Sequence, residues 1–455
     1  MLIDLIKVAS IILNGEKNMI LSIIIGCMTC LVLILAVIFK PTIKINKLKL
    51  DTFWIVAIAG AIITLLSGAL PLDYLANNLE TASSINPLKI MVLLLSLTML
   101  SITLDELGFF EHVASLAIKK VGGSKYKLFF TFYVLTAILT IFTSNDIVIL
   151  TFTLFICYFS KNAKISPIPY LVMEFVTANT YSMLFIIGNP TNIYIASFFN
   201  ISFLDYFKSM WLATILAGLV SLGLLLLIFR KDLSQKMEVS EAAVAPIKHN
   251  TLSIIAIIHL IACTTLLAIA NYINLQMWIV TLMFALSLSI VLIVYTVIFK
   301  DIKPITHVYK RLPYTLCFFV LSMYIIVLSL DYHGISYYIA SYIDNVSSSK
   351  IVTAIIYGTA STIADNLINN IPMSLGFAAI LNEATVNINI ATYATIIGSN
   401  IGAYVTPIGA LAGIMWMRIL KEENAKFGFK DFIKYCSIVA IPTLAAALIG
   451  LLIII

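Results

Sequence analysis

A series of long apolar runs constrains this chain more than any other feature of its sequence. Each run is roughly 17–24 residues long, enough for a helix to cross the ~30 Å of hydrocarbon in a bilayer. Charged residues make up only 11% of the chain, whereas soluble domains average about 25%. We therefore predict an all-α polytopic membrane protein. The predicted transmembrane helices cover residues 19–39, 52–70, 88–104, 167–198, 206–229, 251–270, 275–299, 313–330, 389–417 and 433–455.

Two polar stretches divide the chain. Residues 1–18 form a short amphipathic segment before the first run. No small-residue cleavage site follows that run, so we predict a true span and not a removed signal. Residues 230–250 form the longest polar segment and are predicted to be a cytoplasmic linker between residues 19–229 and residues 251–455.

The charges in the loops predict the topology. Loop 40–50 carries four Lys and is assigned to the cytoplasm, whereas loop 71–87 carries Asp73 and Glu80 without Lys or Arg. Alternation then places both termini outside, and we expect a multi-pass protein of a prokaryotic plasma membrane. The net charge of +6 resides in such loops. We therefore expect the lipid bilayer, and no nucleic acid, as the partner.

The apolar stretch 128–158 differs from an ordinary span because basic residues flank both of its ends. Its middle, Thr143-Ser144-Asn145-Asp146, is polar and would interrupt a helix. Polar backbone is tolerated at membrane depth only where protein or a water-filled cavity surrounds it. We predict a re-entrant helical hairpin with its tip at Ser144–Asp146. The alternative is two thin spans joined by a small external loop.

A second stretch, 351–381, has the same character but enters from outside. Its polar tip runs from Asp365-Asn366 to Asn369-Asn370 and is followed by Pro372. We predict a second re-entrant hairpin here. The alternative is that these amides only satisfy one another between helices.

The two halves of the chain repeat one pattern in opposite orientation. Leu104-Asp105-x-x-Gly108 recurs 226 residues later, Ser144-Asn145 meets Asn369-Asn370 after 225, and Asn179 meets Asn400 after 221. The first copy begins outside and the second inside. Inverted repeats with interrupted helices in corresponding positions indicate a transporter with its site at the bilayer midplane. The interrupted helices here are 167–198 and 389–417.

The hairpin tips and helix breaks together define a candidate site rich in amides and hydroxyls. Its segments contain no Lys or Arg, so an anion would be held by helix N-termini and side-chain donors. A neutral hydroxide suits the same groups, and the sequence leaves both possibilities open. The candidate residues are Ser144, Asn145, Asp146, Asn179, Gly188, Asn189, Thr191, Asn192, Asn366, Asn369, Asn370, Ser399, Asn400, Thr406 and Gly409.

Carboxylates at membrane depth are expensive and are candidates for function. We expect Asp146 and Asp365 to couple transport to an ion. The alternatives are that Asp146 is a solvated helix cap and that Asp365 faces an external vestibule. Glu174 lies within a predicted span without an evident partner.

The chain lacks the sequence patterns of an enzyme or a metal protein. Its six Cys and five His residues are scattered, so no metal site is predicted and no cofactor is expected. No H-E-x-x-H, G-x-S-x-G or Walker A pattern is present. We expect a protein that is not an enzyme. A channel would also need polar intramembrane loops, although inverted repeats favour alternating access.

Several motifs resemble those of a known family. They are Leu104–Glu111, Asn145-Asp146, Asn369-Asn370-x-Pro372, and Gly398–Gly402 through Thr406–Gly409 and Trp416. With them the chain resembles the ion transporter superfamily, and within it the arsenite permeases most closely, from about residue 30 to the C-terminus. Gly188-Asn189-Pro190-Thr191-Asn192 is similar to the corresponding segment of citrate and divalent-anion permeases, including sodium symporters, and of melanosomal-type permeases.

The resemblance implies a scaffold domain and a mobile transport domain that carries both hairpins in an elevator-type transporter. It also implies coupling to H⁺ or Na⁺, by antiport or symport, and a possible homodimer. The hypothesis is an ion-coupled secondary transporter of arsenite, antimonite or another small oxyanion or metalloid hydroxide. The alternatives are a proton- or sodium-coupled citrate or dicarboxylate transporter, a sodium/proton antiporter, and, from a different class, a channel.

Overall fold

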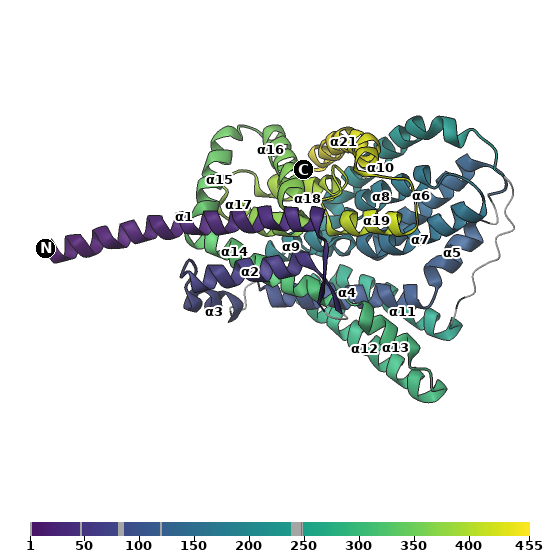
Figure 1. Cartoon of the computed structure of the whole chain (residues 1–455), viewed down its shortest axis with the longest axis horizontal. Coiled ribbons are helices and arrows are strands. Elements are labelled where there is room, and N and C mark those ends of the chain that lie inside the picture. Colours follow the sequence, from purple (N-terminus) through teal and green to yellow (C-terminus); the bar gives the residue numbers. More distant parts are fainter. Residues whose placement is uncertain (1, 46–47, 81–85, 119–120, 238–246, 248) are drawn as a thin grey trace.

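The computed structural model describes residues 2–45, 48–80, 86–118, 121–237, 247 and 249–455, and it is almost entirely helical (Figure 1). The first half contains α1 (Leu2–Phe39), α2 (Thr52–Leu66), α3 (Leu72–Glu80), α4 (Pro87–Glu106), α5 (Phe109–Ile118), α6 (Lys125–Phe142), α7 (Asn145–Asn162), α8 (Ile168–Tyr181), the 3₁₀ turn η1 (Ile186–Gly188), α9 (Pro190–Phe198) and α10 (Phe203–Leu233). The second half contains α11 (Asn250–Ile269), the 3₁₀ turn η2 (Ala270–Ile273), α12 (Met277–Phe299), α13 (Lys303–Arg311), α14 (Tyr314–Tyr332), α15 (Ile335–Val346), α16 (Lys350–Ile368), α17 (Asn370–Glu383), α18 (Ile388–Gly402), α19 (Leu411–Glu422), α20 (Phe429–Phe432), the π turn η3 (Ile433–Ser437) and α21 (Ile438–Ile454).

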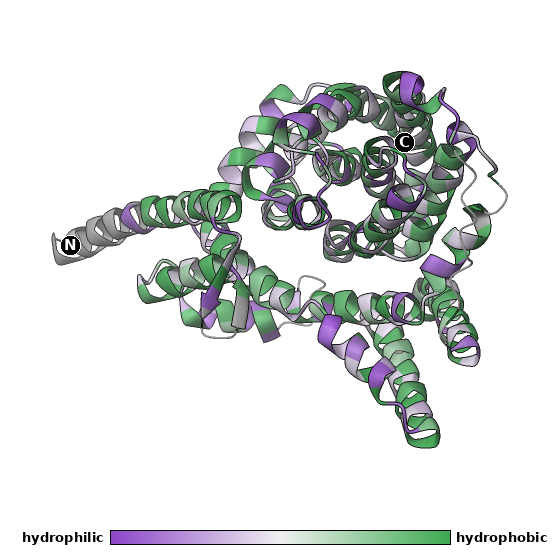
Figure 2. Ribbon diagram, turned by 45° about the vertical axis from the view of Figure 1, so that its right-hand side comes forward, coloured by the Kyte–Doolittle hydropathy of each residue, from purple (hydrophilic) through white to green (hydrophobic). Residues whose placement is uncertain are grey.

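The helices have the length and composition of membrane spans. Within the described residues, nine helices are long and apolar enough to cross a bilayer, including the hairpin arms α6 and α16. Many large apolar side chains are exposed on these helices, and hydrophobic residues predominate along the ribbon (Figure 2). The all-α polytopic prediction is thus confirmed, with a helix count close to that expected.

The helices form two groups, each defined by the helices that pack on one another. A scaffold group, consisting of α1, α2, α4 and α11–α14, is held together by contacts of α14 with α2 and of α12 with α4. A hairpin group, consisting of α6–α10 and α16–α21, packs around α8 and α18. Figure 2 shows a ring of helices above a row of helices. The short helices α5 and α15 connect the two groups along the chain.

Both predicted hairpins fold back at their polar tips. The ring of Phe132 in α6 lies 5.3 Å from that of Phe152 in α7, whereas a continuous helix would separate them by about 30 Å. The ring centroids of Tyr357 in α16 and Phe377 in α17 are 6.5 Å apart. Asn145 is fully buried, as a re-entrant tip requires and a small external loop does not allow.

The same order of elements occurs twice. The series from α4 to α10 corresponds to that from α14 to α21. Gly108 and Gly334, with φ of +80° and +74°, precede the equivalent helices α5 and α15. Each copy packs against the other in the same way. Helix α9 of the first copy packs on α17 of the second, and its counterpart α19 of the second copy packs on α7 of the first. The counterparts α10 and α21 pack on each other. This reciprocity is expected of two copies related by a pseudo-two-fold axis.

Four details differ from the expectations. The predicted loop 40–50 contains two antiparallel strands, β1 (Thr42–Ile45) and β2 (Leu48–Asp51), because apolar and polar residues alternate there with period two. Helix α1 is continuous through most of the amphipathic segment 1–18. Helix α2 has only 15 residues and ends at Leu66, before the predicted end of its span. Residues 238–246 and 248 of the linker 230–250 lie outside the described residues, and α10 extends into the linker as far as Leu233.

Candidate functional site

The two interrupted helices lie at the centre of the hairpin group. Every residue from Pro169 to Thr180 in α8 and from Ile390 to Gly402 in α18 is buried. Each helix then breaks before a second helix begins, at α9 and α19. In the first break Asn189 caps α9 through Thr191 N at 3.1 Å, and Pro190 occupies the first turn, where its missing N–H costs nothing.

Glycines make these breaks tight. A Cβ on Gly188 would lie 2.3 Å from Ser182 O, and a Cβ on Gly409 would lie 2.6 Å from Gly402 O. Both distances are far shorter than a van der Waals contact. Only glycine therefore fits at either of these equivalent positions.

Asn400 is the centre of a buried hydrogen-bond cluster. Its Oδ1 accepts from Ser182 Oγ at 2.7 Å and from Asn189 Nδ2 at 3.0 Å. Its Nδ2 donates to Asn192 Oδ1 at 2.7 Å. Next to it, Ser399 Oγ donates to Thr191 Oγ1 at 3.0 Å. The cluster thus joins the two helix breaks, one from each repeat.

The tip of the first hairpin is bonded to α8. Asn145 Nδ2 donates to Asn179 Oδ1 at 3.0 Å, and Asn179 Nδ2 donates to Phe175 O at 2.8 Å. Ser182 Oγ also lies 2.8 Å from Asn179 O, so it connects this pair to the Asn400 cluster. Because the Asn179 amide is oriented by Phe175 O, Asn145 must present its N–H to Asn179 and its Oδ1 elsewhere.

The tip of the second hairpin is attached to the break after α18. Asn366 Oδ1 accepts from Thr406 N at 2.9 Å and from Thr406 Oγ1 at 2.6 Å. Asn369 Nδ2 donates to Ile408 O, and Asn370 N donates to Gly409 O, both at 3.0 Å. The backbone of Asn369 has a φ of +75°, which asparagine tolerates better than most residues.

Both tips contain acceptor oxygens whose hydrogen-bonding capacity is unused. In the described part of the chain, the buried Oδ1 atoms of Asn145, Asn369 and Asn370 have no hydrogen-bond partner. An unsatisfied buried polar group costs about 1–3 kcal/mol. The buried polar side chains that the structure describes include no Lys or Arg. These tips therefore suit a ligand that supplies O–H donors or positive charge.

The two predicted coupling acids have different surroundings. Asp365 is fully buried, its two oxygens have no partner among the described residues, and a Cβ on Gly402 would lie 2.7 Å from Oδ2. It therefore does not face an external vestibule. Asp146 is half-buried in the first turn of α7, after the half-buried N-cap residue Ser144, whose side chain makes no capping bond.

Three polar residues beside the buried amides were not among the predicted site residues: Ser182, Thr180 and Tyr404. Ser182 was not predicted, although it follows Asn179 by one helical turn. Thr180 Oγ1 lies 3.2 Å from the Tyr404 hydroxyl in the other repeat. Side chains like these were overlooked because single hydroxyls are frequent in membrane helices.

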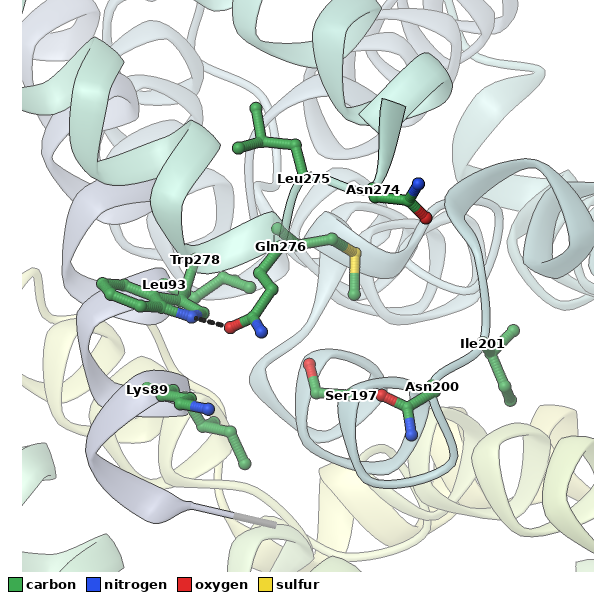
Figure 3. A pocket seen from close by; sticks show the side chains of 11 residues that line it. Lys89, Leu93, Ser197, Asn200, Ile201, Asn274, Leu275, Gln276 and Trp278 are labelled. Atoms are coloured by element: carbon green, nitrogen blue, oxygen red, sulfur yellow. Dashed lines mark hydrogen bonds between the residues drawn. The ribbon is translucent and has the colours of Figure 1, made fainter. Parts of the chain in front are cut away.

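A cavity lies between α4, α9 and α12 (Figure 3). It has a volume of about 350 Å³ and is lined by Lys89, Asn200 and Gln276, with Trp278 Nε1 donating to Gln276 Oε1 at 2.6 Å. Ile90 also lines a second cavity of about 20 Å³, which is bounded by side chains that include Pro190, Tyr194, Ile371 and Ser374. Such a space holds about one water. The space beside the helices that begin at Pro190 and Asn370 is therefore too small to hold a solute in this conformation.

Comparisons with known proteins agree with the motif resemblance. A model of the citrate transporter family, CitMHS, matches residues 34–398. The chain is 26% identical over 381 residues to the arsenical pump membrane protein of Yersinia enterocolitica, covering 78% of this chain and 84% of the relative. It is also 26% identical to a putative arsenical pump membrane protein of Bacillus subtilis, covering 84% of this chain and 90% of the relative.

Two solved transporters share the fold. The Alcanivorax borkumensis YdaH transporter superposes with a TM-score of 0.53 at 12% identity, covering 96% of this chain and 97% of that one. Neisseria gonorrhoeae MtrF superposes with a TM-score of 0.52 at 14% identity, covering 96% and 94%. At these identities the likeness concerns the arrangement of helices alone.

Proposed function

Because the chain belongs to the CitMHS citrate transporter family of the ion transporter superfamily, we propose that it is an ion-coupled secondary active transporter of a small metalloid hydroxide such as arsenite or antimonite. Its arsenical pump relatives motivate this choice of solute. In this proposal the chain lies in the plasma membrane with both termini outside.

The unsatisfied acceptors at the hairpin tips carry the proposal. A metalloid trihydroxide is neutral near pH 7 and brings three O–H donors, which complement the Oδ1 atoms of Asn145, Asn369 and Asn370. A carboxylate brings acceptors only. The lack of Lys and Arg among the described buried residues also favours a neutral solute, because no side chain there would compensate an anion.

A citrate-type anion is the second candidate, and the family description supports it. The helices α7, α9 and α17 begin at the tips and at a break, and helix N-termini attract anions. In that case Na⁺ would occupy the unsatisfied oxygens, since hard cations prefer oxygen ligands.

We further propose that transport proceeds by elevator-like alternating access. Both hairpins belong to one group of helices, and the chain passes between this group and the scaffold group through the short helices α5 and α15 and through the segment between α10 and α11. The narrow cavity beside Pro190 and Ile371 is too small for a solute, as one closed state of such a cycle requires. A channel would instead need a continuous open path.

Counterflow in proteoliposomes tests the proposed function. Vesicles loaded with unlabelled arsenite are expected to take up radiolabelled arsenite transiently above equilibrium, and antimonite inside is expected to compete. Citrate-loaded vesicles provide the comparison. Uptake that merely follows the gradient, without counterflow, would indicate a channel. Counterflow with citrate but not arsenite would indicate that the protein transports a citrate-type anion.

The coupling acids give a separate prediction. Asp365→Asn removes a buried carboxyl whose oxygens have no described partner, so it is expected to abolish the dependence of uptake on the ion gradient while preserving counterflow. Asp146→Asn is expected to act in the same direction. Uptake would be measured under imposed pH and sodium gradients, with the exposed Glu383→Gln as the control. An unchanged response in both variants would remove these acids from the coupling mechanism.

A further inference from the structure

Glu174 is a buried acid outside the amide cluster. It lies in α8 with an exposed fraction of 0%. Thr153 Oγ1 in α7 lies 2.9 Å from its Oε2 and 3.1 Å from its Oε1. Among the described residues, no Lys, Arg or His forms an ion pair with it. A carboxyl is therefore held inside the hairpin group by one hydroxyl.

One hydroxyl cannot satisfy an ionised carboxylate. The Thr153 hydroxyl has a single hydrogen, so it donates to only one oxygen of Glu174 at a time. A buried anion without a cation and with one donor is unfavourable. The protonated acid fits these surroundings better in the present conformation.

A second donor beside the carboxyl is only weakly engaged. The Trp416 indole of α19 lies close enough to Glu174 to act as a side-chain hydrogen-bond donor, but its fully buried Nε1 does not meet the geometry of a full hydrogen bond to any described residue. Trp416 is fixed by aromatic packing, with its ring 4.6 Å from that of Phe175. A small movement of α19 against α8 would let Nε1 donate to an ionised Glu174. The surroundings therefore suit the neutral form now and offer a donor to the charged form.

The carboxyl is joined to the candidate site by the same pair of helices. Thr153–Glu174 and Asn145–Asn179 both connect α7 with α8. Glu174 precedes Asn179 by five residues, about 7.5 Å along a helix. A change in charge at the Thr153–Glu174 contact therefore acts directly on the helices that position the hairpin tip.

Few other titratable groups face this carboxyl. The thiol of Cys157 in α7 interacts with it electrostatically, and Tyr170 lies one turn earlier in α8. Titratable groups of the other elements packed on α8 have their own neighbours. They are Tyr133 of α6, bonded to Tyr181; Tyr206 of α10, packed on Tyr393; Asp232 of α10, which acts on Tyr170; Lys434 and Tyr435 of η3, which pair with each other; and Cys436 of η3, beside Tyr404.

We propose that Glu174 is a proton-binding site of the transport cycle, additional to the acids at the hairpin tips. The carboxylate takes a proton from water to form one O–H bond, and the proton returns to water when that bond breaks. Thr153 and Trp416 are positioning residues, because they orient or stabilise one form of the acid. The proposal rests on the proposed function and adds a proton to its coupling ions.

Glu174→Gln tests the site because Gln keeps the acceptor for Thr153 but cannot release a proton. In proteoliposomes with arsenite we expect near wild-type counterflow, with accumulation driven by a pH gradient reduced at least tenfold. Glu174→Asp is expected to restore accumulation in part, at a shifted pH. Trp416→Phe removes the donor for the charged form, so its pH midpoint is expected to move upward.

Infrared spectroscopy tests the site without any solute. Wild-type protein in lipid is expected to show the carbonyl band of a protonated carboxylic acid that Glu174→Gln loses and Glu383→Gln retains. An unchanged band, or pH-driven accumulation by Glu174→Gln equal to wild type, would overturn the proposal. Absence of arsenite and citrate counterflow in the wild type would instead contradict the proposed function, and the infrared result would still decide the proton site.

Discussion

Asn145→Ala is expected to reduce transport by about 5- to 150-fold without preventing membrane insertion. The substitution removes the bond to Asn179 Oδ1 and leaves that buried oxygen without its donor, which costs ~1–3 kcal/mol. It also removes the acceptor proposed to meet the solute. Asn370→Ala is expected to have an effect of similar size in the second repeat. Initial rates of counterflow, normalised to protein in the vesicles, measure both.

Asn382→Ala is the matched control for these variants. Asn382 is an exposed amide on the second hairpin, bonded only to its neighbour Glu383 among the described residues. It should transport as wild type does. Full activity in both Asn145→Ala and Asn370→Ala would contradict the site, whereas loss in all three variants would indicate a general effect on the hairpins.

Gly188→Ala and Gly409→Ala are expected to lower both stability and transport. The new methyl groups would lie 2.3 Å from Ser182 O and 2.6 Å from Gly402 O, and neither backbone oxygen can rotate away. Relief requires a shift of the helix break, and overpacking of this kind costs ~1–3 kcal/mol. Transport is expected to fall below roughly a tenth of wild type, because ~1.4 kcal/mol already corresponds to a tenfold change.

Two other glycines provide the comparison. A Cβ on Gly223 in α10 or on Gly376 in α17 would meet nothing within 4 Å. Alanine at either position should preserve the melting temperature in detergent and the counterflow rate. If Gly188→Ala behaves like Gly223→Ala in both measurements, the tight breaks are not needed for the candidate site.

The hairpins and breaks could be predicted because their physical causes are local. Basic residues at both ends of 128–158 and the polar segment around Asn145 indicate a chain that returns to its starting side. Gly188 and Pro190 lie close together, and such a Gly-x-Pro segment favours the end of one helix and the start of the next. The strands Thr42–Ile45 and Leu48–Asp51 could not be predicted from the loop charges, because lysines indicate the side of the membrane but not the backbone conformation.

The partners within the site could be predicted only in part. The equivalence of Asn179 and Asn400 follows from the repeat, but their bonds differ: Asn179 meets Asn145, whereas Asn400 meets Ser182 and Asn189 of the other copy. Such contacts depend on how the copies pack and not on spacing along one helix. The Thr153 hydroxyl that holds Glu174 belongs to this class, since nothing near either residue in sequence indicates the other.

We expect the two hairpins to enter the bilayer from opposite faces and to carry the buried amide cluster between them. Single cysteines at Ser124 and Ala163, which flank α6–α7, and at Ser349 and Ala384, which flank α16–α17, would be labelled in intact cells with a membrane-impermeant thiol reagent. Labelling is expected at 349 and 384 from outside, and at 124 and 163 only after the cells are opened. Labelling of the two flanks of either hairpin from different sides would contradict it.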